Sequence, residues 1–356
     1  MTSMTTPIDI RQAVHGGIDT HKATHHAAVI TEDGHLVGQR QFATTTAGCR
    51  ALLAWLGQWQ VHRVGVEQTG TYGAGITREL TAAGYQVVEV NQPDLRVRAM
   101  AGKSDPIDAI MAAEAARTGR ASAVPKHRCG AIESIRLLHT ARRSAVKERS
   151  ALLNQIGAMA ITVPTPLRDR LGRTNRQIAA QSLRLRPNHS QPGDPTHAAR
   201  IALRSLAERI HDLDRRIQRL DTDLDTLLAS TAPRLLARPY VGTHAAAQLL
   251  ITAGENIDRI TSEAKFARLT GTAPIPASSG QTHRMRLHRG GDRAANSAIH
   301  LVAVGRLRSH QPAIDYLARR TSEGLSKKDA IRAMKRLITR ELFGALKADL
   351  KALDAI

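Results

Sequence analysis

The sequence predicts an N-terminal α/β domain followed by a predominantly helical remainder. Three observations support this prediction. Strand-like segments alternate with helix-like segments up to about residue 118, and a heptad of leucine and isoleucine runs from Leu206 to Leu227. The charge is also divided, because residues 1–120 hold 11 Lys/Arg and 11 Asp/Glu, so that the whole net charge of +20 lies in residues 121–356. This division indicates a polyanionic partner that the basic residues 121–356 bind and on which the neutral N-terminal part acts.

The composition also limits the classes of protein. Aromatic residues make up only 3% of the chain, which argues against base stacking as the main contact with nucleic acid. The two cysteines, Cys49 and Cys129, form neither a metal-ligand pattern nor a disulfide framework. The N-terminal segment lacks the features of a secretory signal, and no run of about 18 apolar residues is present. We therefore expect a cytoplasmic, nucleoid-associated protein without a membrane span.

The first ninety residues predict a small mixed sheet. Two strands fall between Val14 and Ile30, the turn Glu32-Asp33-Gly34 follows, and a third strand covers Leu36 to Thr44. Helices and strands then alternate: a helix over 46–59, a strand over 63–67, a helix over about 72–83, a strand over 86–90 and a helix over about 105–118. This order, three antiparallel-type strands and then helix–strand–helix–strand–helix, is that of a ribonuclease H-like fold.

Four carboxylates are placed so that this fold would bring them together. Asp19 lies in the first strand, Glu67 ends the fourth, and Asp105 and Asp108 begin the last helix. Pro106 fits the first turn of a helix, which makes Asp105 the expected N-cap and places Asp108 one turn inside. Carboxylate oxygens of this kind suit Mg²⁺ or Mn²⁺.

Each of these acids also has a purely structural interpretation. Asp19 could cap a turn, Glu67 could pair with Arg63, and Asp105 with Asp108 could form a capping pair beside Lys103. Only their joint placement by the strand order favours a metal site.

The middle of the chain predicts a basic helical region. Residues 121–160 form a basic helix with an apolar stripe, and residues 162–197 are rich in proline and predict a long basic loop or linker. The heptad that follows requires a partner helix. That partner is either the helix over 131–160 of the same chain or the same segment of a second protomer. The heptad residues are Leu206, Ile210, Leu213, Ile217, Leu220, Leu224 and Leu227.

The last third carries two features suited to phosphates. Residues 235–253 resemble a helix-hairpin-helix in which the turn at Gly242 presents backbone N–H groups, although a plain turn between helices fits equally well. Residues 277–293 hold four Arg, two His, two Ser and one acid. Helices are expected over about 294–309 and 326–350. From the residues alone, Ser278-Ser279 is a loop turn, and the expected phosphate contacts are Lys103, Arg284, Arg286, Arg289 and Arg293.

Three segments resemble the motifs of the DEDD transposases of the insertion-sequence "one-ten" family, which are related to Piv-type DNA invertases. These segments are Gly17-Ile18-Asp19-Thr20-His21-Lys22, Val66-Glu67-Gln68-Thr69-Gly70-Thr71-Tyr72 and Lys103-Ser104-Asp105-Pro106-Ile107-Asp108-Ala109. The resemblance implies a RuvC-like catalytic domain over residues 1–125, in which Asp19, Glu67, Asp105 and Asp108 are the acidic set. It implies a helical coiled-coil region over 126–231 and a mostly α C-terminal transposase domain over 232–356.

The same resemblance changes the interpretation of the serines. Ser-Ser-Gly before a basic run and Gly-Gly-Asp-Arg is similar to the C-terminal domain of these transposases, which implies Ser279 as a nucleophile and Ser278 as the reserve candidate. It further implies donor and target double-stranded DNA, a structured guide RNA and a homo-oligomer, either dimer or tetramer.

Three hypotheses follow. The first is a DNA recombinase that cuts and rejoins strands for an insertion sequence with Mg²⁺ and a serine. The second is a RuvC-like junction nuclease that acts through metal-activated water. The third is a non-enzymatic nucleic-acid-binding protein whose acids are structural.

Overall fold

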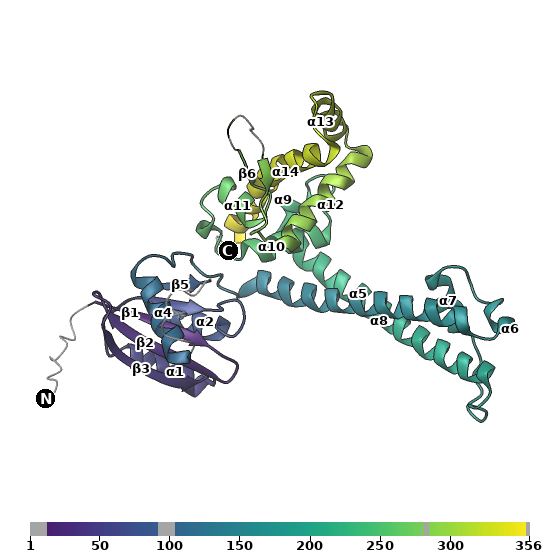
Figure 1. Cartoon of the computed structure of the whole chain (residues 1–356), viewed down its shortest axis with the longest axis horizontal. Helices are drawn as coiled ribbons and strands as arrows, with labels where there is room; N and C mark the ends of the chain where they lie inside the picture. Colours follow the sequence, from purple (N-terminus) through teal and green to yellow (C-terminus); the bar gives the residue numbers. More distant parts are fainter. Residues whose placement is uncertain (1–12, 92–103, 279, 281–284, 354–356) are drawn as a thin grey trace. The chain divides into compact units, whose positions relative to one another are not determined.

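The computed structural model describes residues 13–91, 104–278, 280 and 285–353. By its internal contacts the chain divides into two units. Unit 1 comprises residues 1–128 together with 254–261, and unit 2 comprises residues 129–253 and 262–356. Figure 1 colours the elements of both units by their position in the sequence.

Unit 1 is built on a five-stranded sheet in the order β3-β2-β1-β4-β5. The first three strands are antiparallel neighbours, whereas β4 runs parallel to β1 and β5 parallel to β4. The strands are β1 (Val14–Thr20), β2 (Thr24–Thr31), β3 (Leu36–Ala43), β4 (Val61–Glu67) and β5 (Val87–Val90). The predicted α/β domain and the order of its elements are therefore confirmed.

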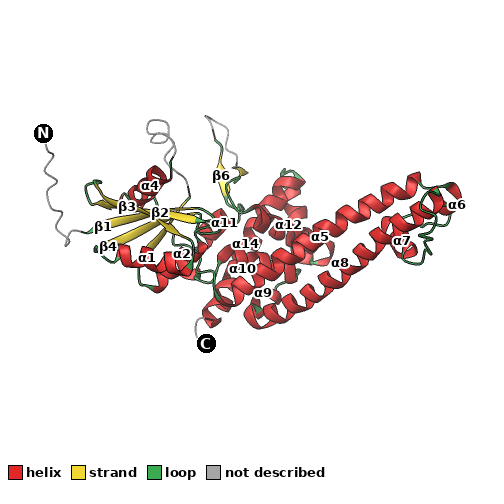
Figure 2. Ribbon diagram, turned by 90° about the horizontal axis from the view of Figure 1, so that it is seen from below, coloured by secondary structure: helices red, strands yellow, loops and turns green. Residues whose placement is uncertain are grey.

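Helices cover both faces of this sheet, which explains why every residue of β1 is buried. The helices are α1 (Thr46–Leu56), α2 (Ala74–Ala82) and α4 (Asp105–Arg117). Figure 2 shows α4 on one side of the strands and α1 and α2 on the other. Ile18 and Val66 belong to the core shared with α1 and α2, whereas Val88 and Val90 pack against the alanines of α4. Successive strand residues alternate between these two cores.

A segment from the second half of the chain completes unit 1. Residues 254–261, which include the short 3-10 helix η1 (Ile257–Arg259), group with residues 1–128. The Asn256 side chain donates a hydrogen bond to the Pro125 carbonyl at 2.8 Å, and the Glu255 carboxylate accepts one from the Arg128 backbone at 3.3 Å. Unit 1 is therefore discontinuous in sequence.

Unit 2 contains a long antiparallel pair of helices, α5 (Gly130–Thr162) and α8 (Pro195–Thr231). Arg142 pairs with Asp221 at 2.8 Å and Arg149 pairs with Asp214 at 2.7 Å. The later residue of α5 pairs with the earlier residue of α8, so the two helices run antiparallel. Five of the seven heptad positions are buried, and Leu220 and Leu227 are half-buried. The partner of the heptad is thus α5 of the same chain.

The long loop predicted over residues 162–197 is partly wrong. This segment contains α6 (Thr165–Arg168) and α7 (Asn175–Ser182). Thr174 and Gln177 form a capping box at the start of α7, and Ile178 and Ala179 are buried in the core of the helical pair. Four arginines of the segment, Arg168, Arg170, Arg173 and Arg176, are exposed.

The remainder of unit 2 is a helical cluster with one short hairpin. Its helices and strands are α9 (Pro233–Leu236), α10 (Thr243–Ala253), α11 (Glu263–Leu269), β6 (Pro274–Pro276), β7 (Met285–Leu287), α12 (Arg293–Ser309), α13 (Gln311–Ser322) and α14 (Lys327–Leu353). The helices expected over 294–309 and 326–350 are present, and α13 is an additional one. Within the described residues, no helix has the length and apolarity needed to cross a membrane.

Candidate active site and basic groove

Two of the predicted acids leave the sheet at the same edge. Asp19 is the second-last residue of β1 and Glu67 is the last residue of β4. Ile18 is paired with Val66 in the parallel ladder, so the next residues of the two strands lie side by side. The Thr20 hydroxyl donates a hydrogen bond to the Glu67 carbonyl at 3.1 Å, which fixes the two strand ends together. Asp19 is only 3% exposed, whereas Glu67 is half-buried.

Two glycines allow α4 to lie directly on this part of the sheet. Each stands two residues before an acid, Gly17 before Asp19 and Gly65 before Glu67, and therefore on the same face. A Cβ atom on Gly17 would lie 2.1 Å from the Ala109 carbonyl oxygen, and one on Gly65 would lie 2.2 Å from that of Ala112. Only glycine fits at either position, and the close approach carries the first turn of α4 to the acidic edge.

The start of α4 differs from the prediction in one respect. Asp105 is not the N-cap, because Ser104 has the extended backbone of the cap and Asp105 is the first helical residue. The predicted position of Pro106 in the first turn is correct. Since the Asp105 carboxylate does not cap the helix, it can turn towards β1. Asp108 lies one turn further and is 3% exposed.

His21 joins the acids of β1 and α4. Its Nε2 atom lies 3.1 Å from the Asp19 carboxylate and 3.3 Å from the Asp105 carboxylate. The sequence analysis did not predict this contact. The spacing Asp19-Thr20-His21 at the end of a strand is the feature of the sequence that is compatible with it. Burial raises the pKa of Asp19, and Asp108 and Asp105 add to this effect, while His21 opposes it. Burial and the neighbouring carboxylates thus disfavour the ionised form of Asp19, and a bound cation would offset this effect.

The donor set fits a divalent metal ion. The ligating atoms of Asp19, His21 and Asp105 all lie within 4.8 Å of one another. Carboxylate oxygens are hard ligands of the kind that divalent cations prefer. Asp108 lies close enough to affect the pKa of Asp19, whereas Glu67 shares the edge but stands outside this group of three. The structure thus brings together Asp19, Asp105 and Asp108 and places Glu67 beside them on the neighbouring strand.

Unit 2 carries a groove rich in cations. Its volume is ≈ 1560 Å³, and the hairpin of β6 and β7 contributes Ser278 and Arg286 to its lining. The other cationic residues of the lining are Arg289, Arg320, Arg332, Lys335 and Arg336, and Asp329 is the acidic one. Asp329 pairs with Arg332, and Arg336 pairs with Glu263. Among the described residues, Arg286 and Arg289 have no ion-pair partner, so both are available to phosphates.

Lys335 lies in the wall of the same groove and is 7% exposed. Its ammonium donates a hydrogen bond to the Asn296 side-chain oxygen at 2.5 Å. Burial lowers the pKa of Lys335, and the nearby Arg332 lowers it further. The sequence did not single out this residue, because a lysine in a basic helix carries no sign that it is buried.

The other residues that the sequence predicted to contact phosphates do not line this groove or lie outside the described residues. Arg293 is the exposed first residue of α12 and Gly242 is exposed just before α10, and neither lines the groove. The turn at Gly242 follows a helix of one turn, and the Gly242 carbonyl accepts bonds from Ala245 and Ala246. Three predicted residues, Lys103, Ser279 and Arg284, lie outside the described residues.

The Gly-Gly-Asp-Arg stretch has a structural explanation. A Cβ atom on Gly291 would lie 2.2 Å from the backbone nitrogen of Gly271. Asp292 caps α12 by accepting hydrogen bonds from Ala294 and Ala295, and it also accepts one from Thr252 at 2.7 Å. This stretch anchors the start of α12 next to the groove.

Comparison with known proteins finds family matches for two segments of the chain. A family model described as a transposase, of the DEDD type, matches residues 16–161, and a second one, described as transposase IS116/IS110/IS902 family, matches residues 232–318. The chain belongs to the IS110 family of transposases. Transposases cut and rejoin DNA, so the hypothesis of a non-enzymatic binding protein is wrong.

Two relatives accompany these matches. The "Insertion element IS900 uncharacterized 42 kDa protein" of Mycobacterium paratuberculosis is 25% identical over 91% of this chain and 93% of its own length. The "Insertion element IS110 uncharacterized 43.6 kDa protein" of Streptomyces coelicolor is 29% identical over 41% of this chain and 37% of its own length. The acidic edge of this transposase lies within the first matched segment, and the groove draws its hairpin from the second.

Proposed function

We propose that the chain cuts and rejoins DNA strands for an insertion sequence, with a metal centre of ribonuclease H-like, RuvC-like type at the acidic edge of unit 1. The observation that carries this proposal is the convergence of Asp19, His21 and Asp105 where α4 reaches the ends of β1 and β4. The strand order with β1 in the centre supports the same type of fold.

Asp19 and Asp105 would hold the ion, with Asp108 and Glu67 completing the set. Mg²⁺ is the ion that suits oxygen ligands and substrate phosphates, and Mn²⁺ could replace it. When bound, it would stabilise the charge on the phosphate under attack. His21 holds the carboxylates of β1 and α4 at a fixed separation through its two contacts.

We further propose Ser279 as the nucleophile, with Ser278 as the reserve candidate. The serine oxygen would bond to phosphorus while the bond from phosphorus to the 3′ oxygen breaks, which leaves a 5′-phosphoserine and a free 3′-hydroxyl. The serine proton would pass to a base or to water, and the departing 3′ oxygen would take up a proton from water. Support comes from Ser278, which lines the groove beside Arg286 and Arg289, since guanidinium groups stabilise charge on a phosphoryl group. The acids of one subunit and the serine of another would then act as a composite site on the same phosphodiester.

The partners in this proposal are donor and target double-stranded DNA, a structured guide (bridge) RNA and further copies of the chain. The basic groove and the net charge of +20 support a nucleic-acid partner of either kind. Co-purified nucleic acid, tested for RNase and DNase sensitivity, separates an RNA-guided enzyme from one that uses DNA alone.

A suicide DNA substrate tests the serine. We expect denaturing gels to show a covalent protein–DNA adduct that is lost in Ser279→Ala and retained in the matched variant Ser326→Ala, whose serine also lines the groove. An adduct that persists in both Ser279→Ala and Ser278→Ala would exclude the serine mechanism. The alternative, a RuvC-like nuclease that uses metal-activated water, predicts that Asp105→Asn abolishes cleavage while Ser279→Ala leaves it near normal.

A further inference from the structure

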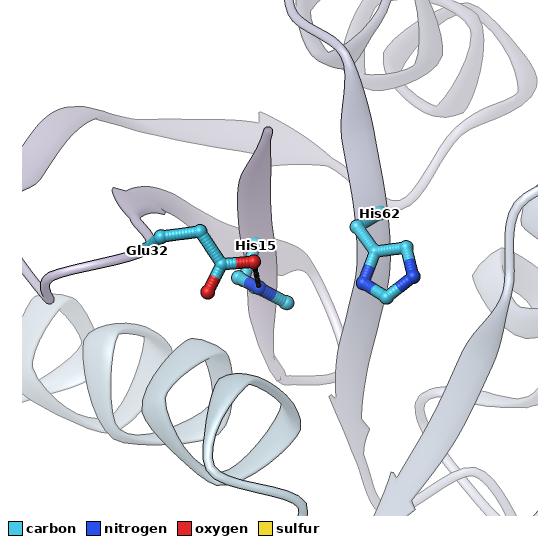
Figure 3. A group of neighbouring side chains, drawn as sticks. All are labelled: His15, Glu32 and His62. Carbon is cyan, nitrogen blue, oxygen red and sulfur yellow. Dashed lines mark hydrogen bonds and ion pairs between the residues drawn. The ribbon is translucent and has the colours of Figure 1, made fainter. Parts of the chain in front are cut away.

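A second cluster of metal-ligating side chains lies at the other end of β1. It consists of His15 near the start of β1, Glu32 directly after β2, and His62 in β4. The His15 Nε2 atom lies 3.0 Å from the Glu32 carboxylate, and the ring centroids of His15 and His62 are 5.5 Å apart. The ligating atoms of all three lie within 4.8 Å of one another. Figure 3 shows His15 between the other two side chains.

An irregularity in the sheet brings His62 into this group. Val14 is paired with Val61, but the next residue, His15, is paired with Arg63. His62 is therefore the extra residue of a β-bulge, and a bulge re-aims a side chain that regular alternation would send to the opposite face. His15 itself is 2% exposed, and its Nδ1 atom is buried without a hydrogen-bond partner in the described structure. The polar contacts of its ring are thus confined to the side that faces Glu32.

We propose that His15, Glu32 and His62 bind a Zn²⁺ ion. Two imidazole nitrogens and one carboxylate oxygen form a usual zinc donor set, with bonds of about 2.0–2.2 Å and one coordination position left for water. Ligands at such distances lie about 3.3–3.5 Å apart in a tetrahedron. The contact of 3.0 Å between His15 and Glu32 already approaches this spacing, and His62, which is exposed, has room to complete it.

The surrounding charges leave Glu32 available to the ion. Arg117 donates a hydrogen bond to the backbone carbonyl of Glu32 at 2.8 Å, and its guanidinium pairs with the Glu114 carboxylate at 2.7 Å. Asp33, the other acid next to Glu32, faces Thr31 and His35.

This site is distinct from the acidic edge. His15 and Asp19 are four residues apart on one strand, which corresponds to roughly 13 Å. The zinc ion would join the ends of β1, β2 and β4 at the position where Arg117, the last residue of α4, also attaches. Its effect would be to fix the sheet and the far end of the helix that carries Asp105, with no part in the chemistry.

Calorimetric titration of the chelator-treated full-length protein with Zn²⁺ tests the proposal. An excess of Mg²⁺ and the double variant Asp19→Asn/Asp105→Asn remove competition from the acidic edge. We expect one Zn²⁺ per chain in this background, and a weakening of at least about tenfold in His62→Ala and in Glu32→Gln. The matched control is His35→Ala, an exposed histidine three residues from Glu32, which should bind Zn²⁺ as before.

Both informative variants change exposed side chains, so they are expected to fold, and a circular dichroism spectrum checks this. Co²⁺ provides a second readout, because a tetrahedral site with nitrogen and oxygen ligands gives visible absorption bands that His62→Ala should lose. The proposal is overturned if Zn²⁺ binds more weakly than about 0.1 mM. It is also overturned if the binding is equally tight in the His62→Ala and Glu32→Gln variants.

Discussion

At the scale of single residues, Asp19 is a proposed metal ligand whose burial makes its ionised form unfavourable for the stability of unit 1. It is 3% exposed and close to two other carboxylates, and the net effect raises its pKa. A carboxyl group whose pKa is higher in the folded than in the unfolded state stabilises the fold at low pH, and this contribution is lost as the pH rises through the raised pKa. Without a bound ion, ionisation of Asp19 therefore lowers the stability of unit 1.

Replacing this carboxylate should separate activity from stability. We expect Asp19→Asn to lower Mg²⁺-dependent strand cleavage by at least about 100-fold, because the ion would have one ligand fewer. In metal-free buffer at pH 7 the same variant should have a higher Tm than the parent, because the disfavoured charge is gone. Cleavage assays and thermal melts measure the two effects. Glu79→Gln, an exposed acid of α2, should change neither, and a lower metal-free Tm in Asp19→Asn would contradict the pKa argument.

The glycine before Asp19 provides a second test at this scale. In Gly17→Ala the new methyl group would meet the backbone of α4 from Ala109 to Ala113, which cannot move aside as a side chain can. We expect a loss of about 3 kcal/mol or more in the free energy of unfolding, together with loss of cleavage. Urea unfolding measures the first. Gly75→Ala is the control, because nothing lies within 4 Å of its added Cβ atom and alanine favours the helix; an equal loss in both variants would refute the close-packing explanation.

Some details at this scale could be predicted from the sequence and others could not. The acids Asp19, Asp105 and Asp108 converge as their motifs imply, because strand order and helix phase fix their positions. The N-cap at Ser104 was missed because serine and aspartate are both favourable N-cap residues. Which of the two is the cap depends on the backbone conformation, which is extended at Ser104, whereas Asp105 is already helical. The contact of His21 with two carboxylates depends on a side-chain rotamer at a strand end, which periodicity does not encode.

At the scale of elements, long periodic segments were predicted well and short ones were not. The strands of unit 1 and helices α5 and α8 follow from alternation and from the heptad over many residues. Helices α6 and α7 have four and eight residues, too few for a pattern to stand out among the prolines. The partner of α8 was left open, because a heptad shows that a partner exists without showing which chain supplies it.

The packing of α5 against α10 gives a pH-dependent term to the stability of unit 2. His139 on α5 is 6% exposed, and its ring lies 6.0 Å from that of His244 on α10. Burial lowers the pKa of His139 to about 4, and His244, Arg143 and Arg142 contribute in the same direction. Since the unfolded state binds this proton more tightly, the neutral ring contributes fully above the ordinary histidine pKa of about 6.5.

We therefore expect the stability of unit 2 to fall as the pH decreases from about 6.5 towards 4, by about 3 kcal/mol in total from this residue. Urea unfolding followed at several pH values between about 7.5 and 4.5 measures the slope. In His139→Leu the slope should decrease, whereas in His211→Leu, an exposed histidine of α8, it should stay unchanged. An unaltered slope in His139→Leu would show that the ring is not kept neutral by its surroundings.

At the scale of the whole molecule, the uneven charge is the feature that the sequence predicted most directly. The net charge of +20 lies entirely in residues 121–356, and the groove of unit 2 contributes Arg286 and Arg289 to it. Charge can be counted without a structure, but the grouping of these two arginines with Lys335 and Ser278 depends on how β7 and α14 pack. The division into a neutral and a basic part is therefore predictable, while the groove is not.

Binding of duplex DNA should depend steeply on salt, because phosphate neutralisation releases counterions. We expect Arg286→Ala/Arg289→Ala to reduce the slope of log K against log salt by about 0.9 for each phosphate that these arginines neutralise. Fluorescence anisotropy at several salt concentrations measures the slope. Arg78→Ala, which removes an exposed arginine of α2, is the matched control, and equal slopes in the groove variant and the parent would exclude the groove as the binding surface.

The return of residues 254–261 to unit 1 has a consequence for how the protein is made. A ribosome releases Asp19, Glu67 and Asp108 long before it reaches Glu255 and Asn256, whose bonds to residues 125 and 128 complete that unit. A nascent chain thus contains all four acidic residues before it contains residues 254–261, which complete unit 1. Folding of unit 1 would consequently be completed late in synthesis, after α5 to α10 have emerged.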